Sequence, residues 1–358
     1  MSALSPEALW RRLSDNALVQ GPMPAAQEPD SPWFIRVLQG LAGWIGALFL
    51  FGFVAAGFLQ VMQSGLAALG VGALSCAAAA AVFRFRSRDD FSCQFGQALS
   101  LAGQGLIIYG LFNLFPGRDS LCLGAAFLIE ACLCLLLPNF ISRVITSMAA
   151  SLALTLSLYS MGLYGLSSGL LAAAFALIWI RDGQRVRWQE LLRPAGYGLA
   201  LTLLGQSAWS LRGVRFYGFG IRPQGDLFGP WAGKALVAAA FLWVVVLLLK
   251  RLRIPPGDRR FSSALSGATL AMAAAIVAPG IAQALLVLLL GFALCNRLLL
   301  GMGMAAFGAF LSSYYYLMES TLLFKAALLF GLGAALLLSR LLLRLWLCPK
   351  AAGGTRHA

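Results

Sequence analysis

The sequence predicts an all-α protein, a polytopic bundle of transmembrane helices. Three observations lead to this fold class: 60% of the 358 residues are hydrophobic, only 11% are charged, and the mean hydropathy is +0.82. A soluble domain carries roughly 25% charged residues, so too little polar material remains here to cover a water-facing surface. The composition therefore excludes a soluble enzyme, a disulfide-stapled secreted domain and a disordered chain.

Residues 1–36 precede the first long apolar run and form the first of three expected regions. Ser5 and Pro6 are typical of a helix N-cap and first helical position, and apolar residues then recur at helical spacing over residues 9–18. A proline-rich linker follows. We expect this cytoplasmic amphipathic helix either to lie on the inner membrane surface, where Arg11 and Arg12 suit anionic headgroups, or to dock to a partner.

Twelve apolar segments follow, each near the length that crosses a bilayer as a helix. They cover residues 37–59, 65–83, 95–115, 120–138, 142–161, 163–180, 195–211, 231–249, 261–278, 279–295, 298–316 and 319–338. The fifth and sixth segments, like the ninth and tenth, are nearly continuous, so each pair is alternatively a re-entrant hairpin or one bent helix. Merging one pair would invert every later loop, and the charge pattern then favours twelve. The transmembrane domain is expected over 37–347, with a cytoplasmic tail over 348–358.

Basic residues alternate between the two sides of these segments. The amino-terminal region, the even-numbered connections and the tail hold 21 of the 27 Lys and Arg residues, whereas the odd-numbered connections carry only Arg118, Arg212, Arg215 and Arg222. This positive-inside asymmetry predicts both termini in the cytoplasm. The net charge of +14 is therefore interpreted as a topology signal, and no nucleic-acid partner is expected.

Motifs for catalysis and metal binding are missing from the sequence. The only histidine, His357, lies in the tail, which removes His-based triads and zinc-protease motifs. Cys132 and Cys134 have the wrong spacing for a zinc ribbon or a thioredoxin-like site. We therefore expect no enzyme activity, no cofactor and no metal, and we expect the cysteines to act as small hydrophobic residues.

Two charged residues lie deep inside predicted spans. Glu130 sits near the middle of segment 120–138, and Lys325 lies about six residues inside the outer end of segment 319–338. A charge at the bilayer centre costs at least about 2.5–3.5 kcal/mol, so Glu130 is paired, protonated or facing water. It is either a proton or cation site or a neutral packing carboxyl. Lys325 either snorkels to the outer headgroups or has a buried partner, for which Glu130 is the other deep charge.

Gln104 and Gln206 end two similar segments in the third and seventh predicted spans. Residues 96–104 and 198–206 are identical at six of nine positions, and both would run in the same direction. A true duplication would therefore be a weak parallel internal repeat. Small residues at helical spacing on both segments predict close helix packing. The two glutamines either form hydrogen bonds between helices or line a polar path.

The longest outer connection, residues 212–230, mixes charge with aromatic side chains. It carries Arg212, Arg215 and Arg222 together with four aromatic residues and seven Gly or Pro residues. Arginine among aromatic side chains suits an external partner or anionic headgroups. The alternative is an ordinary aromatic belt with a flexible turn.

Three stretches of the chain resemble a known family. They are Ala8-Leu9-Trp10 through Gly21 with Pro32-Trp33-Phe34 through Ile45, then Leu99-Ser100-Leu101-Ala102-Gly103-Gln104, and finally Tyr314-Tyr315-Tyr316-Leu317 with Thr321-Leu322-Leu323-Phe324-Lys325-Ala326. Over roughly residues 8–345 the chain resembles the bacterial domain-of-unknown-function 4401 family, although Ala326 stands where a Ser is expected. The resemblance implies a polytopic bacterial inner-membrane protein with no assigned activity. It also implies a complex with a small membrane-anchored protein bearing a GDYxxLxMP motif.

Two functions remain open at this point. The leading hypothesis is a membrane-embedded subunit that acts with a partner in envelope assembly or in export of a small or lipidic substrate. The alternative is a stand-alone secondary transporter that uses Glu130 as its coupling carboxylate. A transporter needs a water-filled cavity near the midplane, lined by Glu130 and by Gln104, Gln206 or Lys325. An assembly subunit can be solid inside.

Overall fold

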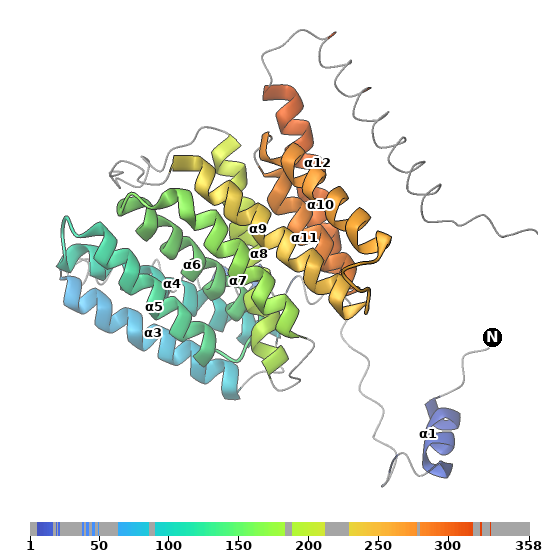
Figure 1. Cartoon of the computed structure of the whole chain (residues 1–358). Helices are drawn as coiled ribbons and strands as arrows, with labels where there is room; N and C mark the ends of the chain where they lie inside the picture. Colours follow the sequence, from blue (N-terminus) through green and yellow to red (C-terminus); the bar gives the residue numbers. More distant parts are fainter. Residues whose placement is uncertain are drawn as a thin grey trace, which may run out of the picture.

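The computed structural model describes residues 6–16, 64–85, 90–182, 188–211, 229–277 and 280–317, together with isolated positions elsewhere. Every regular element in these ranges is an α-helix (Figure 1). The helices are α1 (Pro6–Asp15), α3 (Gly65–Phe85), α4 (Asp90–Leu114), α5 (Asp119–Leu136), α6 (Phe140–Ser160), α7 (Tyr164–Asp182), α8 (Gln189–Leu211), α9 (Gly229–Arg251), α10 (Arg259–Val277), α11 (Ile281–Ala293) and α12 (Arg297–Leu317). Helices α3 to α12 correspond to ten of the twelve expected segments, and the other two lie almost wholly outside the described residues.

Seven of these helices are long and apolar enough to cross a membrane, namely α3, α4, α5, α6, α7, α9 and α12. The chain is therefore a multi-pass helical membrane protein. The other three fall short of that length or that hydropathy, so the twelve expected spans stay a prediction. Helix α11 has only 13 residues, or about 20 Å of helix, against a hydrocarbon core of about 30 Å. Helix α8 contains Pro194 and begins six residues before the expected segment, and α10 carries a face of Ser and Thr side chains.

The two doubtful pairs of segments are separate helices. Helix α6 ends at Ser160 and α7 begins at Tyr164, and Gly162 between them has a φ of 72°. Gly280, with a φ of 89°, precedes α11 in the same way. A positive φ favours glycine, because a Cβ atom would crowd the backbone there. Phe310 of α12 packs onto Gly280, so a larger residue would also meet its ring.

Contacts along the helices show that successive helices from α3 to α9 alternate in direction. Helix α6 runs parallel to α8, and α7 runs parallel to α9. In each of these pairs the contacting residues rise in number together along the two helices. The contacts that fix these directions are Gly72–Gly103 and Gly65–Gly110 for α3 and α4, Cys122–Leu111 and the cluster that contains both Leu137 and Leu99 for α4 and α5, Cys134–Arg143 and Ser157–Ser120 for α5 and α6, Gly198–Val144 and Thr202–Met148 for α6 and α8, Gly196–Trp179 and Gln206–Ser167 for α7 and α8, and Gly233–Gly165 and Gly169–Leu236 for α7 and α9.

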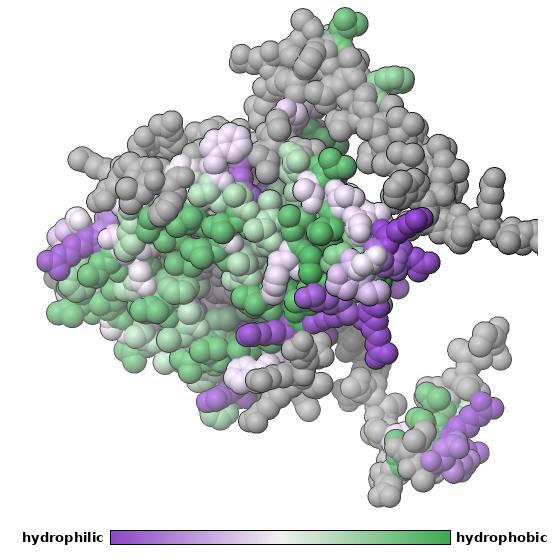
Figure 2. Space-filling view, in the orientation of Figure 1, coloured by the Kyte–Doolittle hydropathy of each residue, from purple (hydrophilic) through white to green (hydrophobic). Residues whose placement is uncertain are grey.

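One end of the bundle carries most of the positive charge, and we call it the basic end. Within the described part of α3 to α12, ten of the twelve Lys and Arg residues lie there, and Arg118 and Lys234 lie at the other end. The ten are Arg84, Arg143, Arg181, Arg193, Lys250, Arg251, Arg253, Arg259, Arg260 and Arg297. Figure 2 shows apolar side chains over the middle of the bundle and hydrophilic ones gathered toward its ends.

Two of these arginines also satisfy helix ends. The Arg143 guanidinium donates to the carbonyl oxygens of Leu137 at 2.7 Å and Glu190 at 2.8 Å, and that of Arg251 donates to Ile180 O at 2.8 Å. Leu137 and Ile180 lie at the C-terminal ends of α5 and α7, where the last carbonyls lack intrahelical partners and cations complement the helix dipole, whereas Glu190 lies in the first turn of α8. Arginine side chains at the basic end therefore join neighbouring helices by hydrogen bonds to their backbone carbonyls.

Apolar side chains lie on both the inside and the outside of the bundle. The largest core cluster joins α7 to α12 and includes Phe175 and Trp179, both essentially buried. Leu74 and Leu270 point outward, with 72% and 71% of their surface exposed. In a bilayer such outward apolar residues contact lipid, so helix association relies on close packing and interhelical hydrogen bonds.

Candidate functional site

Glu130 lies on the buried face of α5. Cys122, Ala126, Glu130 and Cys134 recur at four-residue spacing on this face, and Glu130 is only 2% exposed. The Cys122 thiol donates to a backbone carbonyl of α4, and the Cys134 thiol donates to one of α6. Glu130 therefore points into the seam where α5 meets α4 and α6.

One oxygen of this carboxyl is unpartnered. Glu130 Oε2 is buried and has no hydrogen-bond partner among the described residues. A buried carboxylate needs a counter-charge or several hydrogen bonds, and otherwise takes up a proton. Lys325, the counter-charge considered from the sequence, lies outside the described residues. The seam around Glu130 thus presents a carboxyl group that lacks a full set of partners.

Helix α6 supplies most of the buried hydroxyl groups, and the sequence analysis did not single them out. Seven Ser and Thr residues of this helix are buried, namely Ser142, Thr146, Ser147, Ser151, Thr155, Ser157 and Ser160. Thr146, Ser151 and Thr155 each donate to the carbonyl oxygen four residues earlier, at 2.6–3.0 Å. The signal was available, because seven hydroxyl residues in a 21-residue apolar helix are unusual.

Other polar contacts join α6 to its neighbours. Ser147 Oγ donates to Ala195 O of α8 at 2.9 Å, and Ser142 Oγ is hydrogen-bonded to Gln97 Oε1 of α4. Thr202 Oγ1 of α8 donates to Met148 O of α6 at 3.2 Å. Interhelical hydrogen bonds of this kind stabilise helix association in lipid. Helix α6 is therefore the polar centre of the bundle.

The two candidate glutamines make different contacts. Gln206 is 7% exposed, and its Nε2 donates to Ser167 Oγ of α7, so it joins two helices. Gln104 is 5% exposed and donates to Ser100 Oγ within its own helix at 2.9 Å. Gln206 Oε1, like Glu130 Oε2, has no partner in the described part of the chain. Hydrogen bonding between helices, one of the two roles left open, is thus observed for Gln206.

The small-residue faces of the two similar segments do pack closely, but on different neighbours. A Cβ atom at Gly103 of α4 would lie 2.7 Å from Cys76 Sγ of α3, and one at Gly198 of α8 would lie 2.6 Å from Val144 O of α6. A Cβ atom at Gly205 would meet nothing within 4 Å. The neighbour of α4 is the helix before it, whereas the neighbour of α8 is two helices earlier. The parallel duplication therefore stays a prediction.

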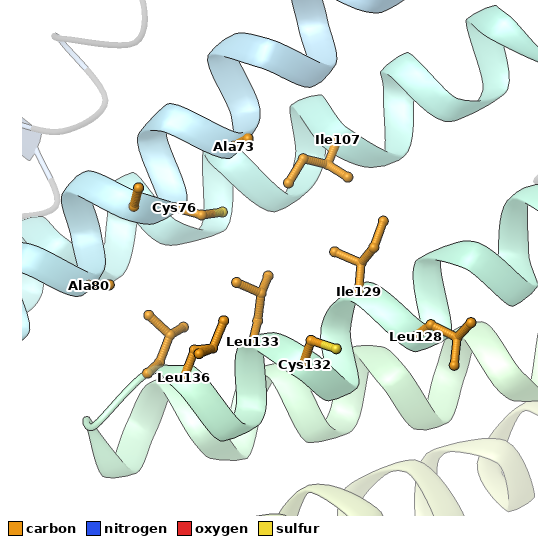
Figure 3. A pocket seen from close by; sticks show the side chains of 11 residues that line it. Ala73, Cys76, Ala80, Ile107, Leu128, Ile129, Cys132, Leu133 and Leu136 are labelled. Atoms are coloured by element: carbon orange, nitrogen blue, oxygen red, sulfur yellow. The ribbon is translucent and has the colours of Figure 1, made fainter.

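A cavity of about 420 Å³ lies between α3, α4 and α5 (Figure 3). It is lined by Ala73, Cys76, Ala77, Ala80, Ile107, Leu128, Ile129, Cys132, Leu133, Leu136 and Leu137, which are all apolar or sulfur-containing. Glu130, Gln104 and Gln206 are not among these residues. Leu128 and Leu136 are 62% and 67% exposed, so the cavity opens at the outer surface of the bundle.

The remaining sequence-based candidates cannot be placed. Lys325, Arg212, Arg215 and Arg222 all lie outside the described residues. In the part of the chain that the structure describes, no group of three or more His, Cys, Asp and Glu residues is arranged to hold a metal ion.

The model of a domain of unknown function (DUF4401) matches residues 32–345. The chain belongs to the DUF4401 family. The matched region contains every helix from α3 to α12, and it includes both Glu130 and Lys325, whereas α1 precedes it. No curated protein and no solved structure matches the chain.

Proposed function

We propose that this DUF4401 protein is a membrane-embedded subunit that acts with a partner protein in envelope assembly or in export of a small or lipidic substrate. The observation that carries the proposal is the packing of the described interior. Glu130, Gln104 and Gln206 are each at most 7% exposed, and the cavity between α3, α4 and α5 is apolar and opens at the side of the bundle. An interior of this kind suits a subunit whose working surface faces lipid or another protein.

The proposal includes a placement in the membrane. We infer twelve crossings of the bacterial inner membrane, with both chain termini in the cytoplasm. The basic end of the bundle then faces the cytoplasm, as the positive-inside rule requires. The gathering of ten basic residues at that end supports this orientation.

The partner we propose is the small membrane-anchored protein with the GDYxxLxMP motif. A tagged copy of the protein, co-expressed with that partner and purified in a mild detergent, should retain the partner in a fixed stoichiometric ratio. An unrelated single-span membrane protein, expressed to the same level, is the control. Recovery of the motif-bearing protein at only the control level would contradict the proposal.

One observation favours the second candidate function, a secondary transporter with Glu130 as its coupling carboxylate. Glu130 Oε2 is buried and has no hydrogen-bond partner among the described residues, which suits a carboxyl that exchanges a proton or cation. Purified protein in liposomes, tested for proton flux under an imposed gradient, separates the two. A flux that Glu130→Gln abolishes would favour the transporter over the assembly subunit.

A further inference from the structure

We propose that the cavity between α3 and α5 binds one phospholipid of the bilayer, with an acyl chain in the cavity and the phosphate at Arg84. The inference goes beyond the proposed function, because it concerns a lipid site and does not depend on the partner protein. It rests on the lining of the cavity, on its opening, and on the distance along α3 from the cavity to the charge of Arg84.

The lining suits a hydrocarbon chain. Small residues of α3, among them Ala73, Ala77 and Ala80, form one wall, and larger residues of α5, among them Leu133 and Leu136, form the other (Figure 3). Among the residues that the structure describes, no polar side chain lines the cavity, so a bound molecule finds carbon and sulfur atoms to pack against. Polar ligands would lose hydrogen bonds to water there without replacement, whereas an acyl chain has none to lose.

The cavity is reached from the membrane. Both Leu128 and Leu136 at its rim are largely exposed, as is Cys132 between them. Since the outer surface of α3 and α5 contacts lipid, an acyl chain enters sideways without crossing water.

The position of Arg84 matches the headgroup of such a lipid. Ala73, Ala77, Ala80 and Arg84 are spaced at i, i+4, i+7 and i+11, so all four lie on one face of α3. The distance from Ala73 to Arg84 along the helix is about 16 Å, close to the thickness of one leaflet, which is about half of the 30 Å hydrocarbon core. A chain lying in the cavity therefore places its headgroup at the level of Arg84.

Charge at that end favours an anionic headgroup. Arg84 is exposed and lies at the basic end, where the Arg143 guanidinium is held against the carbonyl oxygen of Leu137, a lining residue. Guanidinium groups form paired hydrogen bonds with phosphate oxygens, and basic sites between membrane helices bind anionic lipid headgroups. Arg84 is thus the residue that selects the headgroup, while the alanines of α3 admit the chain.

Native mass spectrometry of the delipidated full chain, titrated with phosphatidylglycerol or with phosphatidylcholine, tests the site. The wild-type chain should retain one phosphatidylglycerol in preference to phosphatidylcholine. Ala77→Phe, which fills the cavity from an exposed lining position, should reduce retention at least tenfold, whereas Ala78→Phe, at the neighbouring exposed position outside the cavity, should not. Ala73→Leu is a second, smaller filling change that should act in the same direction.

The headgroup contact has its own variant and control. Arg84→Gln should weaken phosphatidylglycerol binding about fivefold and remove the preference over phosphatidylcholine, the effect of one basic residue near an anionic lipid. Arg118→Gln, at the opposite end of the bundle, should leave both unchanged.

Several outcomes would overturn the proposal. Equal lipid retention by Ala77→Phe and Ala78→Phe would remove the chain site, and an unchanged Arg84→Gln would remove the phosphate site. A wild-type chain that retains no lipid, because a second copy or the predicted span 37–59 fills the cavity, would also reject it. A second copy would be visible as a dimer mass that Ala77→Phe eliminates.

Discussion

The side-chain amide of Asn296 donates a hydrogen bond to the hydroxyl of Tyr197 at 2.7 Å, which joins positions 99 residues apart. Asn296 lies in the turn between α11 and α12, and it also accepts the backbone N–H of Leu299 at 3.2 Å. Tyr197 of α8 packs edge-on against Trp179 of α7 and Phe140 of α6. One tyrosine therefore connects the last described hairpin to three central helices at the basic end.

We expect Tyr197→Phe to lower the free energy of unfolding by about 1 kcal/mol, the net value of a typical hydrogen bond. The aromatic contacts remain in this variant, so the loss reports the hydroxyl alone. Thermal unfolding in detergent, compared with Tyr316→Phe at a position that is 79% exposed, measures the effect. Equal stability of the two variants would show that the Asn296–Tyr197 contact contributes nothing.

The contact between α3 and α4 gives a second prediction. Gly103→Ala should destabilise the protein by about 1–3 kcal/mol, because its Cβ would lie 2.8 Å from Gly72 O and 3.0 Å from Cys76 N, both backbone atoms. Gly105→Ala, on the same helix and with nothing within 4 Å, should be neutral or slightly stabilising. Folded yield and unfolding temperature of the matched pair are the measurements. A Gly103→Ala protein as stable as Gly105→Ala would contradict the close packing.

The unpartnered carboxyl of Glu130 leads to a prediction about Lys325. If Lys325 supplies its counter-charge, Lys325→Met leaves a buried carboxylate alone and should reduce the amount of folded protein in the membrane. Glu130→Gln should then partly restore that amount, because both charges are gone. Wild-type levels for Lys325→Met would reject a buried role for the lysine. Loss without rescue would keep the burial and reject Glu130 as the partner.

Membrane orientation is tested with reporter fusions. Fusions after Ser120 or within residues 215–228 should report as external, and fusions within 182–192 should report as cytoplasmic. The reason is the positive-inside rule together with the basic end, which includes the end of α7 and the start of α8. A cytoplasmic signal from the 215–228 fusion would exclude the twelve-crossing arrangement.

The class of the fold and the approximate positions of ten helices could be predicted from the amino-acid sequence alone, whereas the breaks within the two nearly continuous pairs of segments were left open. Apolar runs and the alternation of arginines are local features, because their effect depends only on the bilayer and on neighbouring residues in the chain. The sequence also singled out Glu130, because a charged carboxylate in an apolar helix costs free energy in the bilayer whichever way the helix packs. The resemblance to the DUF4401 family was likewise carried by short stretches of sequence, and the family model confirms it over residues 32–345.

The buried faces of these helices, and the residues that they contact, are known only from the tertiary structure. Leucine and alanine are as compatible with lipid as with a helix interface, so composition does not distinguish the two sides of an apolar helix. The fold placed Gly103 against α3 and Gly198 against α6, although their local sequences are alike. In the tertiary structure the hydroxyls of α6 are buried, and Glu130 Oε2 has no partner among the described residues. A cavity lies along Ala73 and Ala77. These features depend on close contact between residues that are far apart in the chain. In such contacts the shapes of two helices, and not their hydropathy, determine which helices pack together.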